Sequence, residues 1–315
     1  MATTPLVTID TQHDEMIHDA QLDYYAKKLA TASSDRTVKV FEISGENYTK
    51  CAQLTGHEGP VWQVSWAHPK FGVLLASCSY SGSVIIHRES PSGVWTPIHK
   101  HKQADSSVNS IAWAPHELGL ILACAPSDGK VVILSHRDDD TWVSSSLLDS
   151  KLGCNAVSWG PYHSVGSRDD SGTQYMRLVT GSCDERVRFW RCPVGSTDAW
   201  ELERQENEAS PHNDWVRDVA WAPSTGMPWN MVASCSEDRS VVIWTQSEPM
   251  GPWSAARMNV FNTPVWRVSW SVTGNVLAVS SGDLDVTLWK QSLEGKWELI
   301  STVEDAGPSP HPPQH

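Results

Sequence analysis

The sequence predicts an all-β fold, a six-bladed β-propeller, from two repeated motifs and one anomaly of composition. A strand-like motif that ends in tryptophan recurs along the chain, and a second motif follows each copy. Tryptophan is the anomaly, with 17 residues against 4 phenylalanines and 6 tyrosines. Repeats of roughly 20–50 residues are typical of solenoids and propellers. Hydrophobic residues make up 40% of the 315 residues, which is enough for a packed core.

The first motif is an apolar strand that closes on tryptophan, as in VWQVSW and VWRVSW. Five copies end at Trp66, Trp113, Trp159, Trp221 and Trp270. The intervals between them are 47, 46, 62 and 49 residues. A degenerate first copy, MIHDAQLDY, precedes these five and has Leu22 near the equivalent place. The motif therefore has six copies, the first of which lacks its tryptophan.

The second motif is a strand of small residues, a polar turn and an alternating strand, as in LASCSYSGSVIIH. Its six copies end at Phe41, His87, Leu134, Trp190, Trp244 and Trp289. The period matches a WD-type blade of four strands and about 40–45 residues. Small residues let the blades converge near the axis, and large aromatic residues fill the wedge further out. Aspartate in most of the polar turns suits a tight turn, because its side chain can bond the backbone.

The match to the WD motif is imperfect. The Gly-His pair occurs clearly once, at Gly56-His57, and no strand ends in a literal Trp-Asp pair. We therefore expect the hydrogen-bond tetrad of WD blades to be incomplete in several blades.

A single propeller is predicted over residues 1–303. Its blades are expected at approximately 11–55, 56–102, 103–150, 151–208, 209–259 and 260–303, preceded by an extra N-terminal strand at 5–10. Two polar insertions, 161–177 and 194–214, lengthen the period and are expected to be surface excursions. Residues 304–315 form a Pro-rich tail that is expected to be disordered.

The strand count leaves one strand over. The last blade already has four strand-like segments, ending at Val303, yet the apolar segment PLVTID precedes blade one. This segment is either an arm or a strand that adds to a blade it cannot complete. In the second case blades six and one would leave a gap that strands of another chain could fill.

Composition and motifs argue against several functions. A net charge of −13 without a basic run argues against direct nucleic-acid binding. The N-terminus lacks a signal peptide and no stretch approaches ~18 apolar residues, so a soluble, unsecreted protein is expected, with membrane contact only through partners. Nucleophile-elbow, phosphate-loop and zinc-protease motifs are missing from the sequence, as is any C-x-x-C pair. We expect no enzyme activity, no cofactor and no metal. The alternative to a scaffold is a closed WD-repeat adaptor that binds peptides.

Four long runs resemble one family closely: Ile17–Ile43, Thr55–Val84, His212–Pro223 and Ser269–Glu298. They look like the small WD-repeat subunit shared by the outer coat of COPII vesicles and the Y-shaped complex of the nuclear pore. The resemblance extends over nearly the whole chain, from about Ile9 to Val303. The departures are the region Arg168–Gly172, His87 and the Pro-rich tail.

The resemblance implies an open six-bladed propeller. In that family an α-solenoid partner inserts a three-stranded blade and closes the ring in trans. The implied partners are an α-solenoid coat subunit of COPII and an α-solenoid nucleoporin of the Y-complex. The implied roles are vesicle budding from the endoplasmic reticulum to the Golgi, nuclear pore architecture and a nutrient-signalling complex. The implied locations are the cytoplasm, endoplasmic-reticulum exit sites and COPII vesicles, and the nuclear envelope at nuclear pores.

The candidate partner-binding residues lie on the surplus strand and on the two flanking blades. They are Leu6, Val7, Ile9, Met16, Ile17, Leu288 and Trp289. Two alternatives remain open: Leu288 and Trp289 could be ordinary blade core, and Leu6–Ile9 could pack on their own chain only. No catalytic, cofactor-binding or metal-binding residue is predicted.

Overall fold

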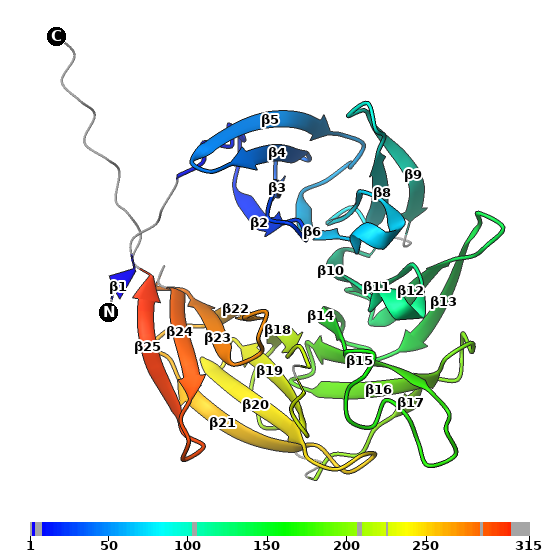
Figure 1. Cartoon of the computed structure of the whole chain (residues 1–315). Helices are drawn as coiled ribbons and strands as arrows, with labels where there is room; N and C mark the ends of the chain where they lie inside the picture. Colours follow the sequence, from blue (N-terminus) through cyan, green and yellow to red (C-terminus); the bar gives the residue numbers. More distant parts are fainter. Residues whose placement is uncertain are drawn as a thin grey trace.

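Six sheets stand around a central axis in the part of the chain that the structure describes (Figure 1). This computed structural model describes residues 2–3, 8–102, 106–206, 210–224, 226–283 and 286–303. In each sheet the four blade strands follow in sequence order from the axis outwards and form an antiparallel meander, and in blade six β1 (Ala2–Thr3) adds a fifth strand outside them. The six-bladed β-propeller predicted from the repeats is confirmed.

The strands of the six blades are as follows. Blade one has β2 (Ile17–Leu22), β3 (Lys28–Ser33), β4 (Val38–Ser44) and β5 (Asn47–Leu54), and blade two has β6 (Val61–Trp66), β7 (Leu74–Ser79), β8 (Ser83–Glu89) and β9 (Trp95–Lys102). Blade three has β10 (Val108–Trp113), β11 (Ile121–Pro126), β12 (Lys130–His136) and β13 (Trp142–Leu148), and blade four has β14 (Cys154–Trp159), β15 (Tyr175–Ser182), β16 (Val187–Pro193) and β17 (Glu201–Leu202). Blade five has β18 (Val216–Trp221), β19 (Asn230–Ser236), β20 (Ser240–Gln246) and β21 (Ser254–Val260), and blade six has β22 (Val265–Trp270), β23 (Val276–Ser281), β24 (Val286–Gln291) and β25 (Trp297–Val303).

Helix is confined to short 3₁₀ turns within the described ranges, η1 (Pro69–Phe71) and η2 (His116–Leu118). Neither has the length or the apolar character that a membrane span requires.

The N-terminal strand differs from the expected one. The structure places β1 at Ala2–Thr3, where it pairs parallel with Thr302 and Val303 at the outer edge of blade six. Residues 8–10 lie in no strand, and residues 5–7 fall outside the described part. The ammonium group of Lys39 bonds the carbonyls of Thr11 and Gln12, so side chains and not a backbone ladder hold this part of the segment.

Every innermost strand carries a bulge at the same place. In all six blades the register to the second strand shifts after the first residue of the inner strand. A bulge turns the extra residue out of the ladder and re-aims its side chain. The residues at this second position are His18, Trp62, Asn109, Asn155, Arg217 and Trp266.

The hairpins between the second and third strands use the predicted aspartates. Asp35 Oδ1 accepts from the Thr37 N–H at 2.9 Å, and Asp238 Oδ1 accepts from the Ser240 N–H at 2.8 Å. The bond lets the turn close around a residue with positive φ, such as Arg36 at 68°. The turn chemistry predicted from the sequence is therefore present in these hairpins.

The two insertions are less superficial than expected. Arg177 of β15 has a side chain that is 2% exposed, and its guanidinium pairs with Glu203 of the second insertion at 2.5 Å. It also donates to the carbonyl of Val165 in the first insertion at 2.6 Å and to Gln246 of blade five at 2.7 Å. Both insertions therefore converge on one buried cation and hold blade four against blade five.

Candidate functional site: the seam between blades six and one

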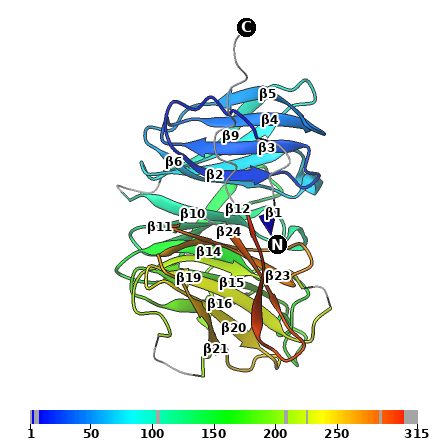
Figure 2. The same ribbon diagram turned by 90° about the vertical axis from the view of Figure 1, so that its left-hand side faces the viewer.

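Five of the six junctions between blades contain a hydrophobic core. One core joins blades one and two, and the next four join blades two and three, three and four, four and five, and five and six. Within the described residues no such core has members from both blade six and blade one. We call this sixth junction the seam; it is bounded by β22–β25 on one side and by β2–β5 on the other. Figure 2 shows these two blades from outside the seam, blade one above and blade six below.

The flank of blade six that faces the seam is partly bare. Leu277 and Val279 of β23 belong to the core shared with blade five. Side chains alternate along a strand, and opposite residues of paired strands share a face. Ala278 pairs with Leu288, and Ser280 pairs with Val286, so these four side chains face the seam. All four are half-buried.

The flank of blade one that faces the seam is covered by its own chain. Val38 and Val40 pack toward blade two, so Lys39 and Phe41 point toward the seam. Lys39 is only 4% exposed and Phe41 only 2%. The segment 8–16 lies over this flank: Lys39 holds its carbonyls, and the Asp10 N–H donates to the hydroxyl of Tyr48 at 3.1 Å.

His13 anchors the covering segment to blade one. Its ring nitrogens lie 2.6 Å from Asp35 Oδ2 and 2.9 Å from Thr31 Oγ1. Burial alone would raise the pKa of Asp35, but hydrogen bonds from Thr37 and His13 outweigh it and lower the pKa to about 2. The carboxylate therefore stays ionised, and it ties the segment to the hairpin of blade one.

Tryptophan indoles link four of the junctions: those of blades one and two, two and three, three and four, and five and six. The Nε1–H groups of Trp66, Trp113, Trp159 and Trp270 donate to backbone carbonyls of the preceding blade at 2.9–3.0 Å. Each acceptor is the residue just before the end of the preceding inner strand. Leu22 occupies the equivalent place in blade one and has no donor to offer. It is 53% exposed.

Near the axis a different side chain occupies the seam. Asp19, Gln63 and Asp218 accept from a backbone N–H of the next blade, at 3.0, 2.6 and 3.1 Å. Blade six has Arg267 at this position, which can only donate. Its guanidinium lies 3.3 Å from Asp19 Oδ1 and donates to the carbonyl of His18 at 3.4 Å. Among the described residues, Arg267 thus bridges the seam near the axis.

Arg267 is held in an acidic cavity on the axis. The cavity has a volume of about 710 Å³, and Asp19, Asp218 and Arg267 are among its lining residues. Burial raises the pKa of Asp218 to about 6, although Arg267 and two backbone N–H groups oppose the rise. Burial likewise raises the pKa of Asp19 against the effect of Arg267. Arg267 therefore compensates two carboxylates that would otherwise be costly to ionise.

The candidate residues divide among different environments. Leu288 faces the seam, whereas Trp289 points the other way, packs on the core shared with blade five, and lies 5.9 Å from the ring of Phe261. Met16 and Ile17 stand at the entry to β2 and are 71% and 42% exposed. Ile9 lies on the segment that covers blade one and is half-buried. Leu6 and Val7 lie outside the described residues.

Histidine networks inside the blades are structural. His212 of blade five bonds Ser234 at 2.7 Å and Asp238 at 3.4 Å, and Trp244 donates to the same Ser234 at 2.9 Å. Blade one places His13 equivalently, a residue that no Gly-His pair marked. Its signal was the distance of 18 residues to the buried Thr31, close to the 20 and 22 that separate His57 and His212 from their serines.

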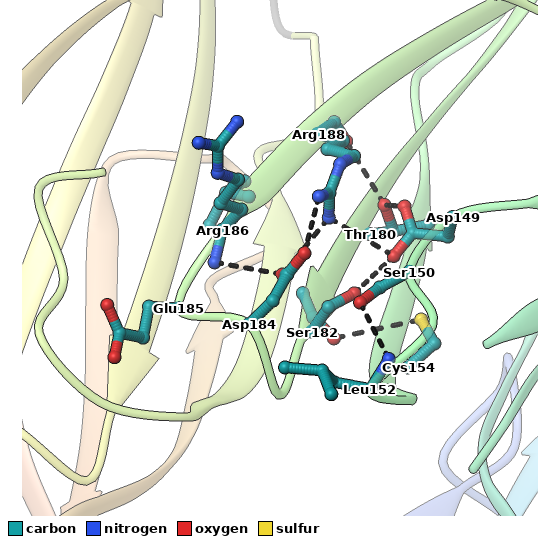
Figure 3. A network of polar contacts seen from close by, with 12 residues as sticks. Asp149, Ser150, Leu152, Cys154, Thr180, Ser182, Asp184, Glu185, Arg186 and Arg188 are labelled. Atoms are coloured by element: carbon teal, nitrogen blue, oxygen red, sulfur yellow. Dashed lines mark hydrogen bonds and ion pairs between the residues drawn. The ribbon is translucent and has the colours of Figure 1, made fainter. Parts of the chain in front are cut away.

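Blade four replaces the histidine with an aspartate (Figure 3). Asp149 accepts from Thr180 Oγ1 at 2.5 Å, from Ser182, and from the Trp190 indole at 3.2 Å. Arg188 lies 3.6 Å from the same carboxylate. Burial raises the pKa of Asp149 even though these four groups act against it. The sequence predicts an incomplete tetrad in several blades; in blade four an aspartate takes the place of the histidine and still ties the strands together.

No group of three or more His, Cys, Asp or Glu side chains in the described ranges is arranged to hold a metal ion. In the part of the chain that the structure describes, the seam has a bare flank on blade six, the ion pair of Arg267 and Asp19, and the segment that covers blade one. This arrangement offers surfaces for association.

Comparison with known proteins agrees with the repeat structure. The profile of the WD domain, G-beta repeat, matches residues 48–88, 205–245 and 257–290. The profile of the anaphase-promoting complex subunit 4 WD40 domain matches residues 72–161.

Relatives match almost end to end. The chain is 48% identical to "Protein transport protein SEC13" of Yarrowia lipolytica, over 95% of this chain and 100% of that protein. It is 49% identical to "Protein SEC13 homolog" of Dictyostelium discoideum, over 94% of this chain and 98% of that protein. The homologue of Drosophila melanogaster is 42% identical, over 98% of this chain and 88% of that protein. With this identity over nearly the full length, and with six WD-type blades in a ring, the chain belongs to the Sec13 family.

Proposed function

We propose that this chain is a non-enzymatic scaffold of protein transport, a propeller whose seam receives a blade from another protein. The observation that carries the proposal is the flank formed by Ala278, Ser280, Val286 and Leu288. These side chains are half-buried at the seam. The equivalent residues of blade one, Ala30, Ala32, Val38 and Val40, are at most 1% exposed against blade two. The relatives named for protein transport support the same role.

The inserted element fits a three-stranded blade donated by an α-solenoid partner. Its faces would pack on Leu288 of blade six and on the segment 8–16 that covers blade one. Met16 and Ile17 would contact it at the entry to β2, and Leu6, Val7 and Ile9 would lie along its edge. Obligate interfaces of this kind typically bury more than ~2,000 Å². A bound blade would also shield part of the Arg267 side chain, which is 41% exposed, from water.

The assemblies that use such a scaffold are those of the family. One is the COPII outer coat, which drives vesicle budding from the endoplasmic reticulum to the Golgi. A second is the Y-complex of the nuclear pore, and a third is a nutrient-signalling complex. In each the chain would contact the solenoid partner, reach the membrane only through partners and bind no nucleic acid directly.

The test is co-purification with the α-solenoid coat subunit in two forms, with and without its donated strands. We expect the complete partner to bind and the truncated one to lose most of its affinity. Leu288→Asp should weaken binding, because it places a charge on the bare flank. Leu148→Asp is the matched control, since Leu148 is an exposed leucine (56%) on the outer strand of blade three. Undiminished binding of the truncated partner would refute the donated blade and favour a closed adaptor.

A further inference from the structure

The outer strand of blade four is much shorter than those of the other blades. The outer strands β5 and β9 have eight residues each, and β13, β21 and β25 have seven. β17 has two, Glu201–Leu202. Its ladder to β16 consists of Trp190↔Leu202 and Arg191↔Glu201. One more backbone bond follows, from the Glu203 N–H to the Phe189 carbonyl at 2.8 Å. The part of β16 nearest its N-terminal end therefore pairs with β15 on its inner side but has no strand of β17 on its outer side.

After Glu203 the chain turns away from β16 and bonds to blade five instead. The Trp253 N–H donates to the Arg204 carbonyl, and the Glu206 N–H donates to the Trp253 carbonyl, each at 2.9 Å. Glu203 is fixed at the point of departure by Arg177 and by the Trp253 indole, at 2.5 and 2.7 Å. These buried contacts hold the segment away from β16, so the open edge is part of the fold.

Side-chain donors from residues 205 and 210 bond two carbonyls at the open edge. The Val187 carbonyl accepts from the amide of Gln205 at 2.7 Å, and the Glu185 carbonyl accepts from the hydroxyl of Ser210. A buried carbonyl needs a donor, and either a side chain or a backbone N–H can supply it. An incoming strand could replace these two donors without leaving a carbonyl unpaired.

A groove of about 700 Å³ lies along this edge. Val187 and the buried Trp244 contribute apolar surface, and Leu202, Pro211 and Pro252 form further walls. Proline has no backbone N–H, so Pro211 and Pro252 cannot donate to the carbonyls of the β16 edge. The volume is within the usual range of binding clefts, ~300–1,000 Å³.

Three arginines line the groove, and two of them are uncommitted. Arg188 is paired with Asp184 at 2.5 Å and with Asp149. Figure 3 shows the guanidinium of Arg186 directed away from that network. Among the described residues neither Arg186 nor Arg204 has an ion-pair partner for its exposed guanidinium. Glu203 and Glu206 also line the groove, but Glu203 is already paired with Arg177. Arg186 and Arg204 therefore outnumber Glu206 in a groove on a chain with a net charge of −13.

We propose that an acidic, extended segment of another protein binds here as the missing outer strand of blade four. Main-chain bonds to Val187 would provide the strand addition, and Arg186 and Arg204 would select acidic side chains. Blade four stands across the ring from the seam (Figure 1), so this surface would remain free when a blade occupies the seam.

The test uses a fluorescein-labelled hexapeptide of alternating glutamate and valine, with capped ends, in an anisotropy titration against the full chain. A lysine–valine peptide of the same pattern is the charge control. The glutamate peptide should bind and the lysine peptide should not. Arg186→Glu and Arg204→Glu should each weaken binding by about fivefold or more. Arg137→Glu, an exposed arginine in the β12–β13 turn, is the matched control and should leave binding unchanged.

A second probe separates strand addition from simple charge attraction. In a glutamate–proline peptide the charges remain but half of the backbone donors are missing. Loss of its binding, together with slower hydrogen exchange of the Val187 amide in the complex with the glutamate–valine peptide, supports strand addition. Equal binding of the proline and valine peptides would overturn the proposal. So would equal losses for Arg137→Glu and Arg204→Glu.

Discussion

Blade one and blade six present the same four positions to their next neighbour, with opposite results. Val40 of blade one is buried against blade two, whereas Leu288 at the corresponding place in blade six is half-buried at the seam. Both strands have apolar residues there, so the strand sequences do not explain the difference. The neighbour explains it, because blade two seals the first flank and no blade seals the second.

Two departures from the repeat lie on the two sides of the seam. Leu22 replaces the tryptophan that would reach across from blade one, and Arg267 replaces the acceptor that would reach across from blade six. Each change removes a link that other junctions have. The sequences of both flanking blades therefore differ from the repeat at the seam. The predictions below compare the stability of the seam with that of the five junctions that have a core.

The largest effect is expected from Leu277→Ala compared with Leu288→Ala. Both leucines belong to blade six, but Leu277 is 0% exposed in the core shared with blade five. Its truncation should cost about 3–4 kcal/mol, because it leaves a cavity. Truncation of the half-buried Leu288 should cost about 1 kcal/mol or less. Chemical denaturation of both variants measures the difference, and equal costs would mean that the seam is packed like the other junctions.

The next effect concerns Arg267→Met and depends on pH. The pKa of Asp218 is about 6 in the folded chain and near 3.8 when unfolded, so the folded state binds this proton more tightly. The resulting stability is complete below pH 3.8 and is lost as pH rises through 6. Without Arg267 the free energy of unfolding should fall further at high pH, because the ionised carboxylates lose their partner. We expect a destabilisation of about 2 kcal/mol at pH 8 and clearly less at pH 5.

Arg191→Met is the control for that measurement. Arg191 pairs with Glu201 at 3.0 Å on the surface of blade four, where screening by water makes the pair weak. Its replacement should change stability by about 0.5 kcal/mol or less at either pH. A pH-independent loss in Arg267→Met would show that the arginine acts through packing alone.

A smaller effect is expected from the indole links. Trp113→Phe removes the bond to the Ser65 carbonyl, 2.9 Å long, and part of the ring contact, at a cost of about 1–2 kcal/mol. The reverse change, Leu22→Trp, would place an indole opposite the carbonyl of Ser269. We expect it to stabilise the free chain by about 0.5 kcal/mol and to weaken partner binding. Thermal melts of both variants show whether each change stabilises or destabilises the chain. A destabilised Leu22→Trp would mean that the seam is too wide for the hydrogen bond from the indole to the Ser269 carbonyl.

The smallest effect tests the segment that covers blade one. Asp35→Asn should loosen the anchor at His13 and cost about 1 kcal/mol at pH 6. The pKa of Asp35 is lowered to about 2 from 3.8, so this stability is present above pH 3.8 and disappears as pH falls through 2. Hydrogen exchange of the Asp10 and Asp14 amides should quicken in the variant. Unchanged exchange would show that Lys39 alone holds the segment.

The six blades could be predicted because their signals are local: a strand period and a small-residue strand repeated six times, with an aspartate in five of the six turns. The cover of blade one could not, because it depends on His13 and Lys39 meeting residues far along the chain. The extra strand was placed by its apolar pattern at 5–10, but side chains of blade one hold residues 10–12. The short β17 could not be predicted either, because the bonds from Trp253 to the segment after Leu202 join residues far apart in the sequence. Strand alternation predicts that Leu288 and Trp289 point to opposite faces of blade six. The structure adds that no neighbouring blade packs on the face with Leu288.

The bridge made by Arg267 has a mechanical consequence. Five hydrophobic junctions join the six sheets in a row, so small angular changes at these junctions add up between blade six and blade one. The ion pair between Arg267 and Asp19 is too weak to offset the summed angular change. A substitution in any distant junction should therefore be read out as a change in the spacing between blade six and blade one, where a partner would sense it.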